Sequence, residues 1–332
     1  GSRLDPLTQC TPKPLIPIAN MPVMDLLLAR LDEVGIKNVI SNTHCLAEQI
    51  HDRYTNANPT SVNCNFVYED QLSGTAGGVK KCEWFFEKGE TFLVMSGDGL
   101  TSVDLKQLIN SHKKSGAIAT MGLTRVPQSE VCHFGVVVTD SNNKVIEFQE
   151  KPDPKEAKSN LVNTGIYIFE TRIFDYIPAN TFFDFAKNVF PALMKNNETI
   201  NSFIINDYWS DIGTLNQYRI STADVLQGKV NINMPYPETD IGWCANTSSI
   251  KSSSVKNGKI IIGENSIVDE NAELYGYNVI GNNCHIKSGA KLTNCIIWDN
   301  VIIEDNVEMN DCIIAHNSII KEGIHLEDST VI

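Results

Sequence analysis

Hydrophobic and polar residues follow one pattern in the first two thirds of the chain. Between residues 23 and 228, segments with apolar residues at helical spacing, such as VMDLLLARLDEVGI at 23–36, alternate with short apolar runs such as TFLVMSGD at 91–98. The helical spacing predicts amphipathic helices, and the short runs predict buried strands. The stretch FGVVVTDSNNKVIEFQEKP at 134–152 predicts a hairpin around a polar turn. This alternation predicts an α/β fold with a mostly parallel, Rossmann-like sheet.

A different pattern starts at Ile262. Apolar residues then recur at every sixth position, at Ile262, Val268, Leu274, Ile280, Ile286 and Leu292. The segments LTNCIIWDNVIIEDNVE and MNDCIIAHNSIIKEGIH align position by position, and LEDSTVI starts a third copy, which makes Leu292, Met309 and Leu326 equivalent. A period of six does not fit an α-helix, and it predicts a triangular parallel β-helix, with ordinary β-hairpins as the alternative.

The stretch between the two patterns contains Pro235 and Pro237 among polar residues and has the composition of a linker. A chain of 332 residues is also long for a single core. We therefore expect one domain at residues 1–228, a linker at 229–245 and the β-helix at 246–332.

Composition narrows the classes of function. The net charge of −13 argues against nucleic-acid binding, although a few basic residues in one cleft can still bind a phosphorylated small molecule. No apolar run approaches the ~20 residues of a membrane span, and no secretory leader is visible. The nine cysteines include no C-x-x-C pair, which favours a reducing, cytoplasmic location over a disulfide framework or a zinc site.

Charged residues next to prolines and strand ends are candidates for chemistry. Prolines stiffen the loop TPKPLIP around Lys13, which follows Arg3; the alternative is a solvated turn. Asp98 follows an apolar strand, where ligands bind in this fold class; the alternative is that it accepts bonds from loop amides. Asp211 in DYWSDIGT is a second carboxylate, and its alternative role is a helix N-cap.

Two further stretches have the composition of ligand-binding loops. QLSGTAGGVKK places Gly74, Thr75 and Ala76 at the start of a helix, where backbone amides can approach a planar or anionic ligand. EFQEKPDP and NTGIYIFE add three polar candidates beside prolines and glycines, Glu150, Lys151 and Asn163.

In their order, the motifs GSRLDPLTQCTPKPLIPIANMPV, GTAGGV, SGDGLT, FGVV, FQEKP, NTGIYIF and YWSDIGT closely resemble the sugar-1-phosphate nucleotidyltransferases. The resemblance is nearest to mannose-1-phosphate guanylyltransferases and covers nearly the whole chain, since many members carry a C-terminal left-handed β-helix of hexapeptide repeats. Members also carry an apolar strand and glycines before the first motif. Because nothing precedes Gly1 in this sequence, we expect that the protein has a further strand ahead of it.

The resemblance implies roles for individual residues. It implies that Arg3 and Lys13 bind the triphosphate and that Asp98 and Asp211 hold Mg²⁺. The residues implied to contact the nucleotide are Gly1, Ser2, Gly74, Thr75, Ala76 and Gly97. The residues implied to line the sugar phosphate are Gly135, Glu150, Lys151, Asn163 and Thr164, with Lys151 on the phosphate and counted among the catalytic residues.

The implied reaction joins an NTP and a sugar 1-phosphate to give an NDP-sugar and pyrophosphate, with GTP and mannose 1-phosphate as the expected pair. Uridylyl, adenylyl or thymidylyl transfer to glucose 1-phosphate is the alternative within the family. A catalytically inactive regulatory subunit is a second alternative, and an acyltransferase built on His285, His316 or His325 of the repeats is a third. Because coil ends of a β-helix leave strand edges unpaired, we also expect a homo-oligomer.

Overall fold

The computed structural model describes residues 2–332, which form two compact units. The unit of residues 27–209 is called the sheet unit here. The β-helix unit combines the N-terminal residues through Leu26 with Ser210–Ile332. Helix α1 (Val23–Glu33) and strand β12 (Trp209–Asp211) contain the points at which the chain passes between the units. The domain boundaries expected from the sequence stay a prediction.

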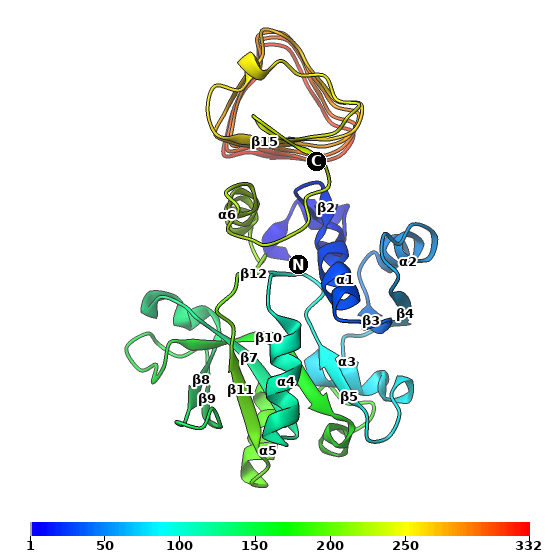
Figure 1. Ribbon diagram of the computed structural model, residues 1–332, viewed down its shortest axis with the longest axis vertical. Coiled ribbons are helices and arrows are strands. Elements are labelled where there is room, and N and C mark those ends of the chain that lie inside the picture. Colours follow the sequence, from blue (N-terminus) through cyan, green and yellow to red (C-terminus); the bar gives the residue numbers. More distant parts are fainter. Residues whose placement is uncertain (1) are drawn as a thin grey trace. The chain divides into compact units, whose positions relative to one another are not determined.

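Alternating strands and helices build the sheet unit, as the sequence predicts. Its strands are β3 (Asn38–Thr43), β4 (Asn63–Tyr68), β5 (Thr91–Val94), β6 (Gly99–Thr101), β7 (Ala119–Arg125), β8 (Gly135–Thr139), β9 (Val145–Glu150), β10 (Leu161–Glu170) and β11 (Ile200–Ile204). Its α-helices are α2 (Ala47–Asn56), α3 (Gly74–Lys81), α4 (Leu105–Ser115) and α5 (Phe190–Lys195), and a π-helix, η7 (Phe185–Val189), precedes α5. Figure 1 shows how these elements follow one another along the chain.

The main sheet has the strand order β11–β7–β10–β8–β9, and β5 also pairs with β10. Strands β11 and β7 are parallel, whereas β10 runs antiparallel to β5, β7 and β8. Strands β3 and β4 form a separate parallel pair, and β8 and β9 form the hairpin expected at 134–152. The α/β fold is confirmed, and within this sheet β9 and β10 run opposite to the other strands.

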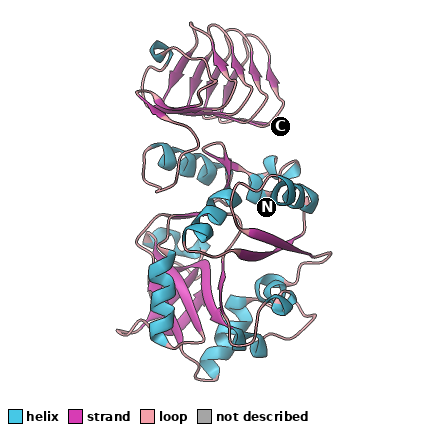
Figure 2. Cartoon of the chain, turned by 45° about the vertical axis from the view of Figure 1, so that its right-hand side comes forward, coloured by secondary structure: helices cyan, strands magenta, loops and turns pink. Residues whose placement is uncertain are grey.

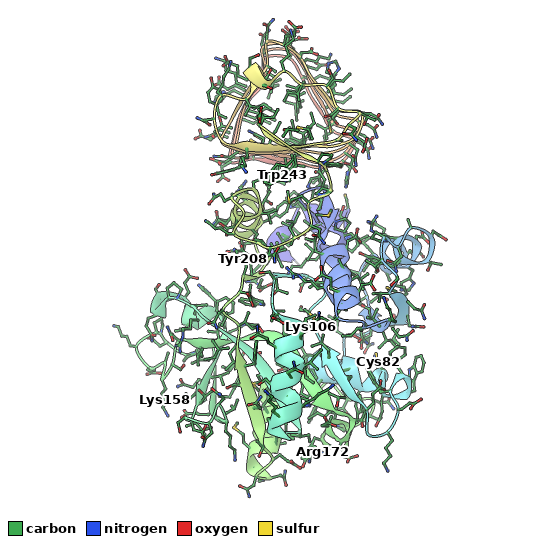
Figure 3. The ribbon with its side chains drawn as sticks, in the orientation of Figure 1. Cys82, Lys106, Lys158, Arg172, Tyr208 and Trp243 are labelled. Atoms are coloured by element: carbon green, nitrogen blue, oxygen red, sulfur yellow. The ribbon has the colours of Figure 1, made fainter. Side chains whose placement is uncertain are left out.

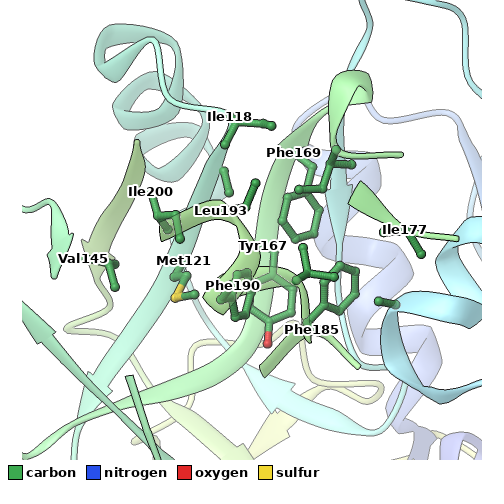
Figure 4. Packing of buried hydrophobic residues seen from close by; sticks show 14 of the residues in the cluster. Ile118, Met121, Val145, Tyr167, Phe169, Ile177, Phe185, Phe190, Leu193 and Ile200 are labelled. Carbon is green, nitrogen blue, oxygen red and sulfur yellow. The ribbon is translucent and has the colours of Figure 1, made fainter. Parts of the chain in front are cut away.

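An aromatic core fills one face of this sheet. Phe169 of β10 stacks on Phe185 of η7 with ring centroids 5.0 Å apart, and Tyr167 and Phe190 pack beside them (Figure 4). Stacked and edge-on pairs of this kind contribute about 0.5–1.5 kcal/mol each beyond the burial of their area. The core therefore fixes β10 and the segment that leads into η7.

Within the described residues, the strands of the β-helix unit from β13 onward form three sheets, and all of their pairings are parallel except that of β13 with β14 (Figure 2). One sheet holds β13 (Glu238–Thr239), β14 (Gly242–Cys244), β15 (Lys259–Ile262), β18 (Tyr277–Ile280), β21 (Ile296–Ile297), β24 (Ile313–Ile314) and β27 (Thr330–Val331). The second holds β16 (Ile267–Val268), β19 (His285–Ile286), β22 (Ile302–Ile303) and β25 (Ile319–Ile320). The third holds β17 (Glu273–Tyr275), β20 (Lys291–Thr293), β23 (Glu308–Asn310) and β26 (His325–Glu327).

The strand register confirms the sequence repeat. Leu292 pairs with Met309 and Met309 with Leu326, so the three equivalent positions stand one above the other. The apolar residues spaced by six, such as Ile262 and Ile280, face the buried core of the helix. Figure 1 looks along this core and shows the triangular cross-section. The predicted parallel β-helix is confirmed.

Asparagines at one corner stabilise the turns between sheets. Asn265, Asn283, Asn300 and Asn317 all have positive φ, which costs asparagine less than other residues. Their side-chain amides bond to one another from coil to coil, at 3.2, 3.2 and 3.1 Å. This ladder explains why Asn recurs in the repeat.

Among residues 2–332, no helix combines the length and the apolar character that crossing a lipid bilayer requires. The nine cysteines are free thiols.

Candidate active site

The N-terminal loop of the β-helix unit is held in shape by prolines and by buried apolar residues. Lys13 begins the short 3-10 helix η3 (Lys13–Leu15), and the Leu15 amide donates to the Pro12 carbonyl at 2.8 Å. Leu7 and Ile16 are buried on either side. Because proline fixes φ near −65°, the loop has few alternative conformations. Lys13 therefore extends from a rigid support.

Lys13 and Asp211 meet although 198 residues separate them in the sequence. Lys13 Nζ lies 3.3 Å from Asp211 Oδ1, and the two side chains are 18% and 41% exposed. Ion pairs of this exposure contribute only about 0–1 kcal/mol of stability. The pair therefore adds little to stability, and the more exposed Asp211 carboxylate is accessible to a ligand.

Gly213 packs closely against Arg3 and Asp211. A Cβ atom at Gly213 would lie 3.2 Å from Arg3 Nη2 and 3.3 Å from Asp211 Oδ2. Arg3 and Asp211 thus both border Gly213, just before helix α6 (Leu215–Leu226), and Lys13 contacts Asp211 through its other carboxylate oxygen. Guanidinium and ammonium groups bind phosphate oxygens by charge-assisted hydrogen bonds.

Asp211 is not the N-cap of α6. The Thr214 hydroxyl accepts a hydrogen bond from the Gln217 amide at 3.1 Å and fills that position. The carboxylate of Asp211 is therefore not needed to cap the N-terminus of α6.

Asp98 lies in the sheet unit, in the loop between β5 and β6. The Ser96 hydroxyl donates to Asp98 Oδ1, and the intervening Gly97 is exposed. This is the carboxyl end of β5, where the sequence places Asp98. Its contact with Ser96 is to a hydroxyl and not to a loop amide.

Both aspartates offer the hard oxygen donors that Mg²⁺ prefers. Asp211 Oδ2 also borders the space that a Cβ at Gly213 would fill. In the described part of the chain, no group of three or more His, Cys, Asp or Glu side chains is arranged to hold a metal ion. Each aspartate alone would fill only part of the coordination shell of Mg²⁺, which usually takes its other ligands from water and phosphates.

The glycines of GTAGGV bring the start of α3 against the segment before η7. The amides of Ala76 and Gly77 both donate to the Phe183 carbonyl at 3.0 Å. A Cβ at Gly74 would lie 2.5 Å from that oxygen, and a Cβ at Gly77 would lie 2.8 Å from the Thr181 carbonyl oxygen. Close backbone packing thus explains the glycines at both positions.

Thr75 is joined to the same segment through its side chain. Its hydroxyl donates to Asp184 Oδ2 at 2.8 Å and accepts from the Phe185 amide at 3.0 Å. Asp184 Oδ1 accepts from the amides of Ala186 and Lys187, so Asp184 also caps η7. The predicted base contacts of Gly74, Thr75 and Ala76 stay predictions, with the Thr75 hydroxyl already engaged inside the chain.

The hairpin β8–β9 brings Gly135, Glu150 and Lys151 together. Gly135 pairs with Glu150, and the Lys151 amide donates to the Phe134 carbonyl at 3.1 Å. A Cβ at Gly135 would overlap the Phe148 ring, so any larger residue there requires that ring to move. Glu150 and Lys151 are exposed, so their charged groups are accessible to a ligand.

Asn163 and Thr164 lie at an irregularity of β10, where the register against β7 shifts. The Asn163 amide donates to Tyr167 Oη at 2.6 Å, and its oxygen accepts from the Gly165 amide at 3.1 Å. The buried Thr164 hydroxyl donates to the Gly122 carbonyl at 2.7 Å. Burial raises the pKa of Tyr167 well above its ordinary value, so the phenol stays neutral. The sugar contacts of Asn163 and Thr164 stay predictions.

Sequence reasoning missed Asp184 and Tyr167 and could not place the remaining nucleotide contacts. An aspartate directly before the helical pattern FAKNVFPALM is an N-cap signal and could have indicated Asp184. No local signal marks Tyr167, because its importance comes from its burial and from Asn163. Gly1 lies outside the described residues, as does the side chain of Ser2.

Two family models match the chain. Residues 1–228 match the nucleotidyl transferase model, and residues 242–332 match the model of the EIF2B subunit epsilon LbH domain. The second match supports the left-handed β-helix that the resemblance implies.

Individual proteins match over most of the chain. A UTP–glucose-1-phosphate uridylyltransferase of Synechocystis sp. is 34% identical, over 90% of this chain and 80% of the relative. A mannose-1-phosphate guanylyltransferase of Mycobacterium tuberculosis is 28% identical, over 91% and 78%. A glucose-1-phosphate adenylyltransferase of Fervidobacterium nodosum is 32% identical, over 91% and 77%. The crystal structure of HddC from Yersinia pseudotuberculosis superimposes with a TM-score of 0.56 at 25% identity, covering 65% of this chain and 90% of HddC.

Proposed function

The chain belongs to the nucleotidyl transferase family, and from this premise we propose that it joins an NTP to a sugar 1-phosphate and releases pyrophosphate. An oxygen of the sugar 1-phosphate forms a bond to the α-phosphorus of the NTP. The bond from the α-phosphorus to the oxygen that bridges to the β-phosphate breaks, and pyrophosphate leaves with that electron pair. Because the attacking oxygen is already ionised, the reaction needs no general base. It needs two anions to be held in line and their charge to be neutralised.

The observation that carries this proposal is that Asp211 has two basic neighbours: Lys13 pairs with its Oδ1, and Arg3 borders Gly213 together with its Oδ2. Arg3 and Lys13 bind the triphosphate and stabilise the negative charge of the leaving pyrophosphate. Lys151, exposed at the end of β9, binds the phosphate of the sugar. A chain that only bound sugars would not need the two cations beside Asp211.

Asp98 and Asp211 are the residues we assign to Mg²⁺. When bound, Mg²⁺ neutralises phosphate charge and orients the phosphates for in-line displacement. The assignment predicts that Asp98→Asn and Asp211→Asn each lower turnover by orders of magnitude and that excess chelator abolishes it. Asp175→Asn, a change at an exposed aspartate of the sheet unit, is the matched control.

For the substrates, the sequence favours GTP and mannose 1-phosphate by resemblance. The relative from Synechocystis, at 34% identity, instead favours UTP and glucose 1-phosphate as a second candidate pair. The test is pyrophosphate release with GTP, UTP, ATP and dTTP, each combined with mannose 1-phosphate or glucose 1-phosphate. One pair should exceed the others by at least about tenfold in kcat/KM, which corresponds to about 1.4 kcal/mol of discrimination. No release with any pair would favour the inactive regulatory subunit.

We also propose that the protein forms homo-oligomers through the β-helix. Its outer faces carry exposed apolar residues such as Ile267 and Ile319, which are 43% and 50% exposed. Light scattering that finds only monomers would remove this part of the proposal.

A further inference from the structure

One outer face of the β-helix is buried although it points away from the helix core. In strands β15, β18 and β21, one residue next to each core residue points outward: Ile261, Val279 and Ile296. Each of these three side chains is at most 3% exposed. Helix α6 lies directly beside this face in the same unit (Figure 1). On the side of α6, Tyr218 and Leu226 are fully buried. The face is therefore a packing surface of the β-helix unit.

Two hydrogen bonds run from this face to the N-terminal loop through Tyr218. Trp298 Nε1 donates to Tyr218 Oη at 3.0 Å, and the Tyr218 hydroxyl donates to the Pro17 carbonyl at 2.6 Å. Trp298 is 2% exposed and Tyr218 is fully buried. Burial raises the pKa of Tyr218 above its ordinary value, so its hydroxyl keeps the proton that it donates. Pro17 stands four positions after Lys13 in the sequence.

A second contact holds the same part of the loop. Ala19 and Asn20 form the turn of the hairpin β1 (Pro17–Ile18) and β2 (Met21–Pro22), and both have positive φ, as the tight two-residue hairpin turn requires. The Asn20 amide donates to the carbonyl of Ile280 in β18 at 2.8 Å. The hairpin that follows Lys13 is thus bound directly to a coil of the β-helix.

Asp211 is held by the same helix. Ser210, the residue before it, accepts a hydrogen bond from Gln217 Nε2 at 2.9 Å, and its hydroxyl lies 2.9 Å from that of Ser221. Gln217 and Ser221 belong to α6, as does Tyr218. One helix therefore connects the β-helix face to both members of the Lys13–Asp211 pair.

We propose that this face of the β-helix sets the geometry of the triphosphate-binding residues, with Trp298, Tyr218 and Asn20 as positioning residues. The inference rests on the proposed function for its kinetic consequences, although the positioning itself is a property of the loop. A coil far along the sequence would then control how Lys13 and Asp211 meet the NTP. Any ligand or subunit that shifts this face would change NTP binding through the same contacts.

The first test measures the rate of amide hydrogen exchange in the N-terminal loop, without substrates. Hydrogen exchange followed by mass spectrometry reports the amides of Leu15 and Ile16, which donate to the carbonyls of Pro12 and Lys13. Trp298→Phe and Asn20→Gly each remove one donor, and glycine keeps the positive φ at position 20. Because each variant loses about one hydrogen bond that stabilises the closed loop, these amides should exchange roughly five- to tenfold faster than in wild type.

The matched control is Trp243→Phe. It makes the same chemical change in the same β-helix, at the Trp243 labelled in Figure 3. Lys259 Nζ lies over the Trp243 ring, 4.8 Å from its centroid. Loop exchange at the wild-type rate in both Trp298→Phe and Asn20→Gly would overturn the inference, as would equal acceleration by Trp243→Phe. Because exchange needs no turnover, it decides the inference even if the wild-type protein releases no pyrophosphate.

The second test separates positioning from a general loss of stability. In active protein, Trp298→Phe should raise the KM for the NTP several-fold and leave the KM for the sugar 1-phosphate unchanged. An equal rise in both KM values, or a change in kcat alone, would contradict a specific effect on the triphosphate loop. An inactive wild-type protein would instead refute the proposed function.

Discussion

Replacing Gly74 by alanine tests how the start of α3 is held. Gly74 has φ +76°, and a Cβ there would meet the backbone oxygen and carbon of Phe183 at 2.5 and 3.0 Å. An alanine with left-handed φ costs about 1–2 kcal/mol. The segment at Phe183 must also move away, which breaks the bonds from Ala76 and Gly77 at 3.0 Å each. Those two bonds add about 0.5–1.5 kcal/mol each, so the total is about 2–5 kcal/mol.

Gly89→Ala is the matched control. Gly89 has φ +85° in the same unit, but a Cβ there would meet no atom within 4 Å. It should therefore cost only the conformational term, about 1–2 kcal/mol. Native-state hydrogen exchange of the amides in β7 and β10 measures the opening free energy of the sheet unit in both variants. Equal destabilisation by the two substitutions would refute the close packing of α3 against Phe183.

Three further predictions concern side chains. Asn300→Ala removes the hydrogen bonds to Asn283 and Asn317 at a residue with φ +59° and should lower the free energy of unfolding in a urea titration by about 1–3 kcal/mol. Asn300→Gly removes the same bonds but adopts positive φ more easily, so it should lower the free energy of unfolding less. Thr75→Val removes the hydrogen bonds to Asp184 and Phe185 and should raise the KM for the NTP several-fold in steady-state kinetics. Thr75→Ser keeps both bonds and should resemble wild type in the same assay. Burial lowers the pKa of His316 in the folded protein, so the unfolded chain binds a proton there more readily. The free energy of unfolding is therefore highest above the ordinary histidine pKa of about 6.5 and decreases as pH falls through the lower folded-state pKa. Tm should fall more between pH 7 and 5 in wild type than in His316→Gln.

The β-helix could be predicted in detail because its signal is local and repeated. The equivalence of Leu292, Met309 and Leu326 follows from an aligned repeat, and each coil then imposes the register of the next. The helix expected within residues 23–36 is found as α1, which ends shortly before Gly35 at φ +82°, whereas the cap of α6 is Thr214 and not the Asp211 considered from the sequence.

The remaining features depend on contacts between distant segments. The antiparallel direction of β10 is set by its neighbours in the sheet, and an apolar run does not encode it. The bond between Trp298 and Tyr218 joins residues 80 positions apart, and a buried tryptophan in a repeat resembles any other core residue. For the candidate site, the motifs supplied residues whose roles stay predictions, and the hydrogen bond between Thr75 and Asp184 required coordinates.

The central claim is that an oxygen of the sugar 1-phosphate attacks the α-phosphorus of an NTP. The most direct measurement uses a sugar 1-phosphate whose phosphate oxygens carry ¹⁸O, with mass spectrometry of the products in the presence of Mg²⁺. The account predicts that all of the label is found in the NDP-sugar and that the pyrophosphate contains none. Label in the pyrophosphate, or nucleotide hydrolysis without an NDP-sugar, would contradict it.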